Sequence, residues 1–148
     1  MKIALGSDHA GFQLKKEIAD YLGSSGMVFE DFGVFTEDSA DYPDIAALVA
    51  GAVKSDQCSC GVLICGTGIG MSIAANKYKG IRAALCGDTF SARYAREHNN
   101  ANILTMGSRV IGSGLALVIV DTFLNSSFEG GRHNRRIEKI ALAEGLKN

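Results

Sequence analysis

Cys65 is the residue with the clearest chemical potential in this sequence, because of what surrounds it. It ends the apolar run Val62-Leu63-Ile64 and is followed at once by Gly66-Thr67-Gly68-Ile69-Gly70. These closely spaced glycines allow a tight turn in which several backbone N–H groups point at one place. Such a turn at a helix N-terminus suits an anion or an oxyanion, and it favours a thiolate, which can act as a base or a nucleophile. A buried strand cysteine without chemistry is the alternative, and this pattern alone leaves both open.

Asp8 and His9 follow the first apolar run, in Gly6-Ser7-Asp8-His9-Ala10-Gly11. If that run is a strand of the same sheet, both side chains face the crevice that holds Cys65. Asp8 could instead cap the next helix, and His9 could be an ordinary loop residue. Gly11 is followed by Phe12 rather than by Lys and Ser or Thr, so the segment is not a triphosphate-binding Walker loop.

His98 is predicted to end a helix, just before the polar turn Asn99-Asn100-Ala101-Asn102. A helix C-terminus favours a protonated imidazole, so His98 could donate a proton. A plain capping role explains the same position equally well.

Arg132 and Arg136 are four residues apart and therefore share one face of the last predicted helix. Two guanidinium groups on one face can bind a phosphate. Arg135 and Lys139 lie on the neighbouring stripe. A solvated or salt-bridged face is the alternative interpretation of this basic run.

Composition and spacing argue against several classes of partner. The net charge is −1 and no aromatic residues interleave with the basic cluster, which disfavours nucleic acid. A metal site is not expected, since Cys58-Ser59-Cys60 lacks a second pair and His9, His98 and His133 show no metal-ligand spacing.

The sequence also favours a cytoplasmic protein without a membrane segment. The densest apolar stretch, Leu115 to Val120, ends at Asp121, far short of the ~20 residues that a membrane span needs. The N-terminus lacks the apolar core of a signal peptide. The unevenly spaced cysteines do not suggest a disulfide framework, and we expect all of them to be reduced: Cys58, Cys60, Cys65 and Cys86.

Short β-like runs alternate with helical patterns along one domain, residues 1–148. This alternation predicts an α/β, three-layer Rossmann-like fold with a five-stranded parallel sheet flanked by helices. The expected strands are 2–6, 28–32, 61–65, 81–86 and 102–106. The expected helices are 12–22, 44–54, 71–77, 90–97, 115–124 and 132–143. Ligands of such sheets bind beyond the carboxyl ends of the strands, where Asp8, Cys65 and Asp88 fall.

A thiolate, a cluster of N–H donors, an acid–base histidine, a carboxylate and paired arginines together suit proton abstraction next to a carbonyl in a phosphorylated small molecule. Seven ordered motifs also make the chain resemble the ribose-5-phosphate isomerase B family from Lys2 to about Ile140. They are Ser7-Asp8-His9-Ala10-Gly11, Asp41-Tyr42-Pro43-Asp44, Ile64 to Lys77, Gly80-Ile81-Arg82-Ala83, Arg96-Glu97-His98-Asn99, Gly107-Ser108-Arg109-Val110 and Glu129-Gly130-Gly131-Arg132-His133.

The resemblance implies interconversion of ribose 5-phosphate and ribulose 5-phosphate without a cofactor, by homodimers or homotetramers whose active sites are shared between subunits. It implies that Cys65 is the base and that His98, with Asp8, opens the sugar ring. The oxyanion would be held by the N–H groups of Gly66, Thr67, Gly68, Ile69 and Gly70 and by the Thr67 hydroxyl. Asn99 would bind the sugar and Tyr42 would line the pocket. The phosphate ligands would be His9, Arg109, Arg132 and Arg136, and His98, Asn99 and Arg109 would come from the partner subunit.

Two departures from the family pattern bear on these roles. Some relatives have a glutamate base at the position of Met71, which cannot take a proton, so that role falls to Cys65. Asn100 stands where the family often has aspartate, which weakens assumptions about hydrogen bonds around His98.

Two other functions remain open at this point. An isomerase of six-carbon phosphates, such as allose 6-phosphate or galactose 6-phosphate, is the first. A dinucleotide-binding module is the second, because Gly66-x-Gly68 follows a strand and Asp88 lies at a suitable distance for a ribose. The third glycine of that fingerprint would fall at Met71, which breaks it.

Overall fold

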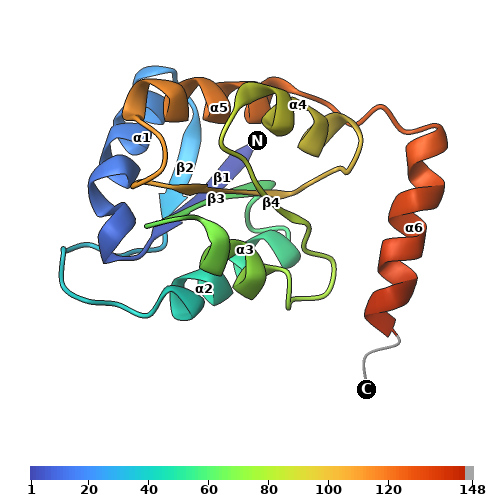
Figure 1. The fold of residues 1–148 in the computed structure, drawn as a ribbon, viewed down its shortest axis with the longest axis horizontal. Helices are drawn as coiled ribbons and strands as arrows, with labels where there is room; N and C mark the ends of the chain where they lie inside the picture. Colours follow the sequence, from blue (N-terminus) through green and yellow to red (C-terminus); the bar gives the residue numbers. More distant parts are fainter. Residues whose placement is uncertain (146–148) are drawn as a thin grey trace.

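Five parallel strands form one sheet in the order β2-β1-β3-β5-β4 (Figure 1). The computed structural model describes residues 1–145. The strands are β1 (Lys2–Ser7), β2 (Val28–Asp31), β3 (Cys60–Cys65), β4 (Ala83–Leu85) and β5 (Ile103–Gly107). All five predicted strands are confirmed, and the fourth is shorter than expected because only Ala83 to Leu85 pair with β5.

Helices cover both faces of this sheet, as the alternating pattern predicts. They are α1 (Phe12–Ser24), α2 (Tyr42–Lys54), α3 (Ile69–Ala75), α4 (Thr89–Glu97), α5 (Ser113–Asn125) and α6 (Arg132–Gly145), with a short 3₁₀ turn, η1 (His9–Gly11), before α1. Figure 1 shows α1, α4 and α5 on one face and α2 and α3 on the other. The three-layer α/β fold is therefore confirmed.

The central strands are apolar because helices bury both of their faces. Every residue of β3 is buried. Ile3, Val62 and Leu104 belong to the core beneath α1 and α5. Ala4 and Leu63 point the other way and belong to the core beneath α2 and α3. None of the helices in the described part of the chain is long and apolar enough to cross a bilayer.

Helix α6 differs from the other helices in its packing. Figure 1 shows it beside the body, beyond the end of α4, rather than on a face of the sheet. His133 is its buried residue, whereas Ile140 and Leu142 are 45% and 69% exposed. An amphipathic helix with exposed apolar residues lacks a covering surface within the described chain.

Candidate active site

The carboxyl ends of β1, β3 and β5 are tied together by hydrogen bonds, at the edge of the sheet where the sequence predicts a ligand-binding crevice. The Asp8 N–H donates to the Ile64 carbonyl at 3.1 Å, and the Ser108 N–H donates to the Cys65 carbonyl at 2.9 Å. The Ser108 hydroxyl also donates to the Ala10 carbonyl at 2.7 Å. Residues far apart in the sequence therefore meet at one edge of the sheet, as expected for parallel strands.

Cys65 ends β3 with its sulfur directed at the glycine-rich turn. Its Sγ accepts a hydrogen bond from the Gly68 N–H at 3.0 Å, and the residue is only 5% exposed. Gly68 has a φ of +78°, and a Cβ there would lie 2.5 Å from Leu85 and 2.7 Å from the backbone of Met106. Only glycine fits this position, so the predicted tight turn is confirmed.

The turn differs in detail from the expected cluster of free N–H donors. Helix α3 begins at Ile69 rather than Met71. The Gly68 N–H is bonded to sulfur, and the Ile69 N–H donates to the Thr67 hydroxyl oxygen at 3.3 Å. Because Thr67 Oγ1 accepts that bond, its own proton is directed elsewhere and can be donated to a ligand.

Asp8 and His9 lie at the crevice, each with a partner within the chain. Asp8 caps η1 by accepting from the Gly11 N–H at 3.1 Å, and the residue is 7% exposed. His9 Nδ1 accepts from the Ala40 N–H at 3.3 Å. Asp8 therefore has the capping role that the sequence left open, and this hydrogen bond engages one oxygen of its carboxylate.

Tyr42 and Arg109 flank the glycine turn. A Cβ at Gly70 would lie 2.8 Å from the Tyr42 ring, and one at Gly66 would lie 3.5 Å from the Arg109 side chain. The Arg109 N–H donates to the Gly66 carbonyl at 3.1 Å. Arg109 thus lies beside the Cys65 turn of its own chain, whereas the resemblance implied that a partner subunit would supply it.

His98 and Asn99 lie at the opposite edge of the sheet from Cys65. Helix α4 starts after the carboxyl end of β4 and runs back, so His98, which caps its C-terminal end, precedes the start of β5. The Asn102 carbonyl accepts from the Gly61 N–H at 2.9 Å, near the start of β3. Because the 5 residues of β5 span about 16 Å, one chain does not bring His98 to Cys65.

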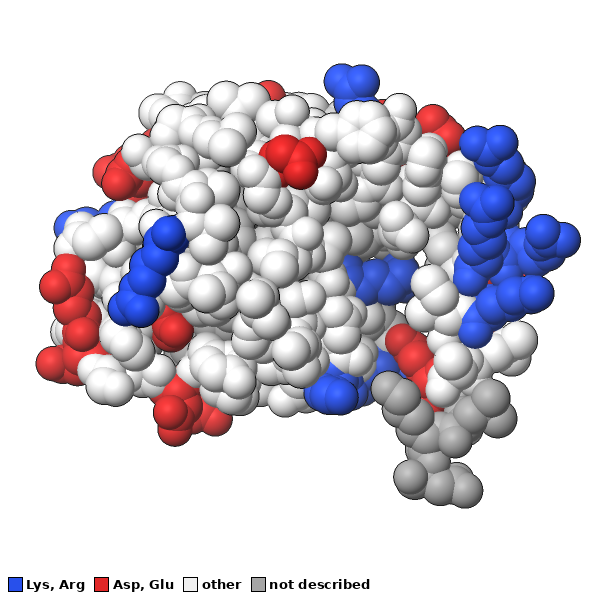
Figure 2. All heavy atoms as spheres, in the orientation of Figure 1, with Lys and Arg blue, Asp and Glu red and all other residues white. Residues whose placement is uncertain are grey.

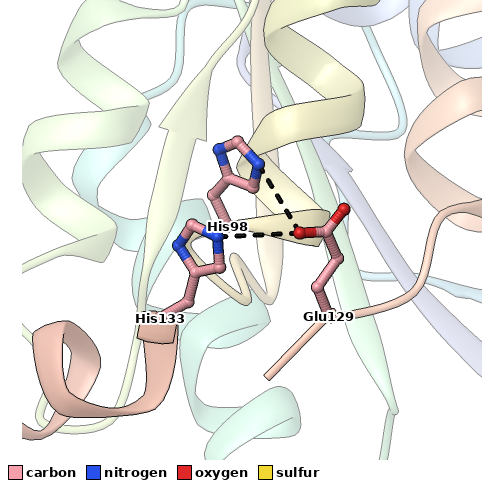
Figure 3. Close-up of side chains that lie close together, drawn as sticks. All are labelled: His98, Glu129 and His133. Atoms are coloured by element: carbon pink, nitrogen blue, oxygen red, sulfur yellow. Dashed lines mark ion pairs between the residues drawn. The ribbon is translucent and has the colours of Figure 1, made fainter. Parts of the chain in front are cut away.

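A compact cluster surrounds His98 and contains residues that sequence reasoning did not place there (Figure 3). His133 stacks on His98 with ring centroids 4.2 Å apart and 11° between the planes. Glu129 Oε2 lies 3.8 Å from His98 Nε2 and 3.6 Å from His133 Nε2. Glu129 and His133 are four residues apart but do not share a helix, because α6 begins at Arg132 and Gly130 and Gly131 have positive φ values, so helical spacing could not have revealed their pairing.

His98 and His133 show no metal-ligand spacing in the sequence, yet the fold brings their side chains together. Their ring nitrogens and the Glu129 carboxylate lie within 4.8 Å of one another, a set that could hold a metal ion. The two rings are parallel, however, so their in-plane lone pairs run side by side, and a shared ion would require one ring to turn.

The paired arginines lie next to this cluster. Arg132 Nε donates to His133 Nε2 at 3.4 Å, and the positive charges of Arg132 and Arg136 help to lower the pKa of His133, after the larger effect of its burial. Figure 2 shows basic side chains gathered over α6. The predicted site residues thus form two groups, one around Cys65 and one around His98.

Asp88, the candidate ribose ligand of a dinucleotide site, has a structural role. It caps α4 by accepting from the Ser91 N–H at 2.7 Å and from the Ser91 hydroxyl at 2.8 Å. Its carboxylate oxygens are therefore engaged within the chain, which argues against the dinucleotide-binding module.

Thiol labelling should separate Cys65 from the other cysteines. All four cysteines are free, and burial raises the pKa of Cys60 and of Cys86 to about 11. At pH 8 only about one thiol in a thousand is ionised at such a pKa, and the fraction rises about a hundredfold by pH 10. We expect iodoacetamide at pH 8 to modify Cys65 first, measured by peptide mass spectrometry. Equal labelling of Cys60 or Cys86 at pH 8 would contradict the assignment.

Comparison with known proteins places this geometry in a family. Residues 3–140 match the family model described as Ribose/Galactose Isomerase. A structure of ribose-5-phosphate isomerase B from Clostridium thermocellum is 56% identical, covers 98% of each chain and superposes with a TM-score of 0.97.

Two further relatives carry information about ligands. A structure of ribose-5-phosphate isomerase B from Mycoplasma genitalium, with bound ribulose 5-phosphate, is 44% identical, covers 99% of this chain and 97% of the other, and has a TM-score of 0.94. A relative from Pectobacterium atrosepticum, 46% identical over 97% of this chain and 95% of its own, is named D-erythrulose-4-phosphate isomerase.

Proposed function

The chain belongs to the ribose/galactose isomerase family, and we propose that it interconverts ribose 5-phosphate and ribulose 5-phosphate without a cofactor. The observation that carries the proposal is the Cys65 sulfur, which lies at the end of β3 and accepts the Gly68 N–H. A single base held beside backbone donors and a free hydroxyl is what proton transfer between two neighbouring carbons requires.

The chemistry follows from the Cys65 group of residues. The Cys65 thiolate removes the proton from C2 of the open-chain aldose, and the electrons of that bond move onto the aldehyde oxygen to give an enediolate. The Thr67 hydroxyl and the N–H groups of the turn other than those of Gly68 and Ile69, which are bonded within the chain, stabilise that oxygen. The proton on O2 passes to O1, the resulting thiol returns its proton to C1, and C2 becomes the carbonyl of the ketose.

Ring opening must precede this step, and it uses the His98 group. A protonated His98 gives its proton to the ring oxygen as the C1–O4 bond breaks, and the C1 hydroxyl proton passes to Asp8. Asn99 holds the sugar and Tyr42 lines the pocket. Because Asp8 and Cys65 lie at the opposite edge of the sheet from His98, the His98 that completes a site comes from a second copy of the chain.

Exposed apolar residues supply a surface for that second copy. Ile69 and Ile73 of α3 are 52% and 57% exposed, and Ile140 and Leu142 of α6 are similarly open. Association of two copies would bury these residues and bring one α6 against the other molecule, in a homodimer or in a homotetramer built from such dimers. Reduced thiols suit the cytoplasm, where we place the enzyme in pentose phosphate metabolism.

The phosphate ligands are expected to be Arg132 and Arg136, together with His9 and Arg109. Arg132→Ala and Arg136→Ala should each raise KM for ribose 5-phosphate about tenfold to a hundredfold, since charge-assisted bonds contribute about 1.5–3 kcal/mol. Arg135→Ala, on the neighbouring stripe of the helix, is the matched control and should leave KM unchanged. Steady-state kinetics that show no change in either arginine variant would mean that the phosphate binds elsewhere.

The same kinetics test the substrate class. Ribose 5-phosphate, allose 6-phosphate, galactose 6-phosphate and unphosphorylated ribose are compared on the unmodified enzyme. We expect the highest kcat/KM for ribose 5-phosphate and very little turnover of ribose. A six-carbon phosphate preferred over ribose 5-phosphate would replace the proposed substrate with the alternative one.

A further inference from the structure

His98 is held on three sides by other side chains. The Tyr94 ring lies 4.4 Å from the His98 ring, centroid to centroid, and tilted by 42°, while His133 stacks on it at 4.2 Å. The Glu129 carboxylate approaches His98 Nε2 (Figure 3). The imidazole is nevertheless 33% exposed, so it remains accessible to a ligand.

The backbone between Glu129 and His133 is shaped to direct both side chains at His98. Gly130 and Gly131 have φ values of +67° and +55°, which only glycine adopts without strain. The Glu129 N–H donates to the Glu97 carbonyl at 3.0 Å, which joins this segment to the end of α4. The reversal of the chain at the two glycines then places His133 over the ring of His98.

The charges of the cluster fit a proton donor. Burial lowers the pKa of His133, and the neighbouring His98, Arg132 and Arg136 lower it further, so His133 is a neutral ring at neutral pH. Glu129, which is 52% exposed and negatively charged, faces both imidazoles. The Glu129 carboxylate can therefore pair with the His98 imidazole, while the stacked His133 ring fixes its plane.

We propose that Glu129 and His133 are positioning residues for ring opening: they fix the orientation of the His98 imidazole from which the ring oxygen takes its proton. This inference rests on the proposed function. Both residues contact His98, which acts on the ring oxygen, and neither supplies the base or the donors for the proton transfer between C1 and C2. Their loss should slow the opening of cyclic sugars and leave the proton transfer of open-chain sugars unaffected.

A four-carbon sugar phosphate separates these two steps. Erythrose 4-phosphate cannot close a five-membered ring, because its C4 hydroxyl carries the phosphate, and a relative is named for a four-carbon phosphate. We expect Glu129→Gln and His133→Ala to lower kcat/KM for ribose 5-phosphate by about tenfold or more. For erythrose 4-phosphate the values should stay within about twofold of the unmodified enzyme. His133→Phe keeps a stacking ring and should recover part of the loss.

Glu138→Gln is the matched control, because it removes a carboxylate from an exposed position of α6, the helix that carries His133. We expect no change in its kcat/KM for either substrate. Equal losses on both substrates would indicate a merely structural role, and no loss on ribose 5-phosphate would also overturn the proposal. An unmodified enzyme inactive on every sugar phosphate would instead refute the proposed function.

If the unmodified enzyme isomerises ribose 5-phosphate but rejects the four-carbon sugar, the same distinction comes from ribulose 5-phosphate, which is also open-chain. Exchange of its C1 hydrogen in D₂O, followed by proton NMR, requires only the proton transfer. Glu129→Gln should preserve this exchange while isomerisation of ribose 5-phosphate falls. Exchange that falls in parallel with isomerisation would contradict the positioning role.

Discussion

Replacement of Cys65 by alanine should lower kcat for ribose 5-phosphate by at least about a thousandfold, because the base of both proton transfers is lost. Substrate should still bind, since the phosphate ligands lie on other residues. The Cys65→Ser variant keeps the shape of the side chain but offers a far weaker base, so it should be nearly as inactive. Steady-state kinetics measure the loss, and calorimetric titration with ribose 5-phosphate measures the binding.

Cys58→Ala is the control for this substitution. It removes a buried thiol that lies outside the crevice, so any effect should be on stability and not on kcat. A Cys65→Ala enzyme that retains kcat within about tenfold of the unmodified protein would exclude the thiolate as the essential base.

The fold could be predicted from the sequence because each signal is local. Apolar runs such as Val62-Leu63-Ile64 indicate buried strands, and their alternation with helical patterns specifies a parallel sheet. The ends of the helices were predicted less accurately. Helix α2 begins at Tyr42 rather than Asp44, since Pro43 is favoured in the first turn. Helix α3 begins at Ile69 because Gly68 turns the chain there.

The Cys65 group of site residues could also be predicted, since the strand, the thiol and the glycine turn are consecutive in the sequence. The His98 group could not, because its residues come from separate segments of the chain. His133 reaches His98 only because Gly130 and Gly131 adopt positive φ values, which no apolar periodicity encodes. That His98 lies away from Cys65 could have been deduced, because a helix that returns across a parallel sheet ends at the edge where the next strand begins.

Asn100 stands where the family often has aspartate, and its backbone conformation gives this residue a structural role. It has a φ of +43°, three residues after Glu97, the last residue of α4, and its N–H donates to the Arg96 carbonyl at 3.0 Å. Asparagine tolerates this conformation better than most residues, and its carbonyl accepts from Arg82 Nε at 2.9 Å. Its role in the structure is therefore to end the helix that carries His98.

If two copies of the chain share each active site, mixing two inactive variants should produce a large gain in activity. Cys65→Ala and His98→Ala should each be nearly inactive alone, yet a mixture of the two should recover activity. A heterodimer of the two variants has one site with both substitutions and one site with neither. If subunits exchange at random in an equal mixture, half of the dimers are heterodimers, and the recovered kcat should be about a quarter of that of the unmodified enzyme.

This mixing experiment asks directly whether Cys65 of one copy works with His98 of another. Native mass spectrometry of differently tagged variants establishes that heterodimers form, and the isomerase assay is run on the same sample. We expect recovery toward about one quarter of the unmodified activity. Heterodimers that form fully and remain as inactive as the separate variants would contradict the shared site.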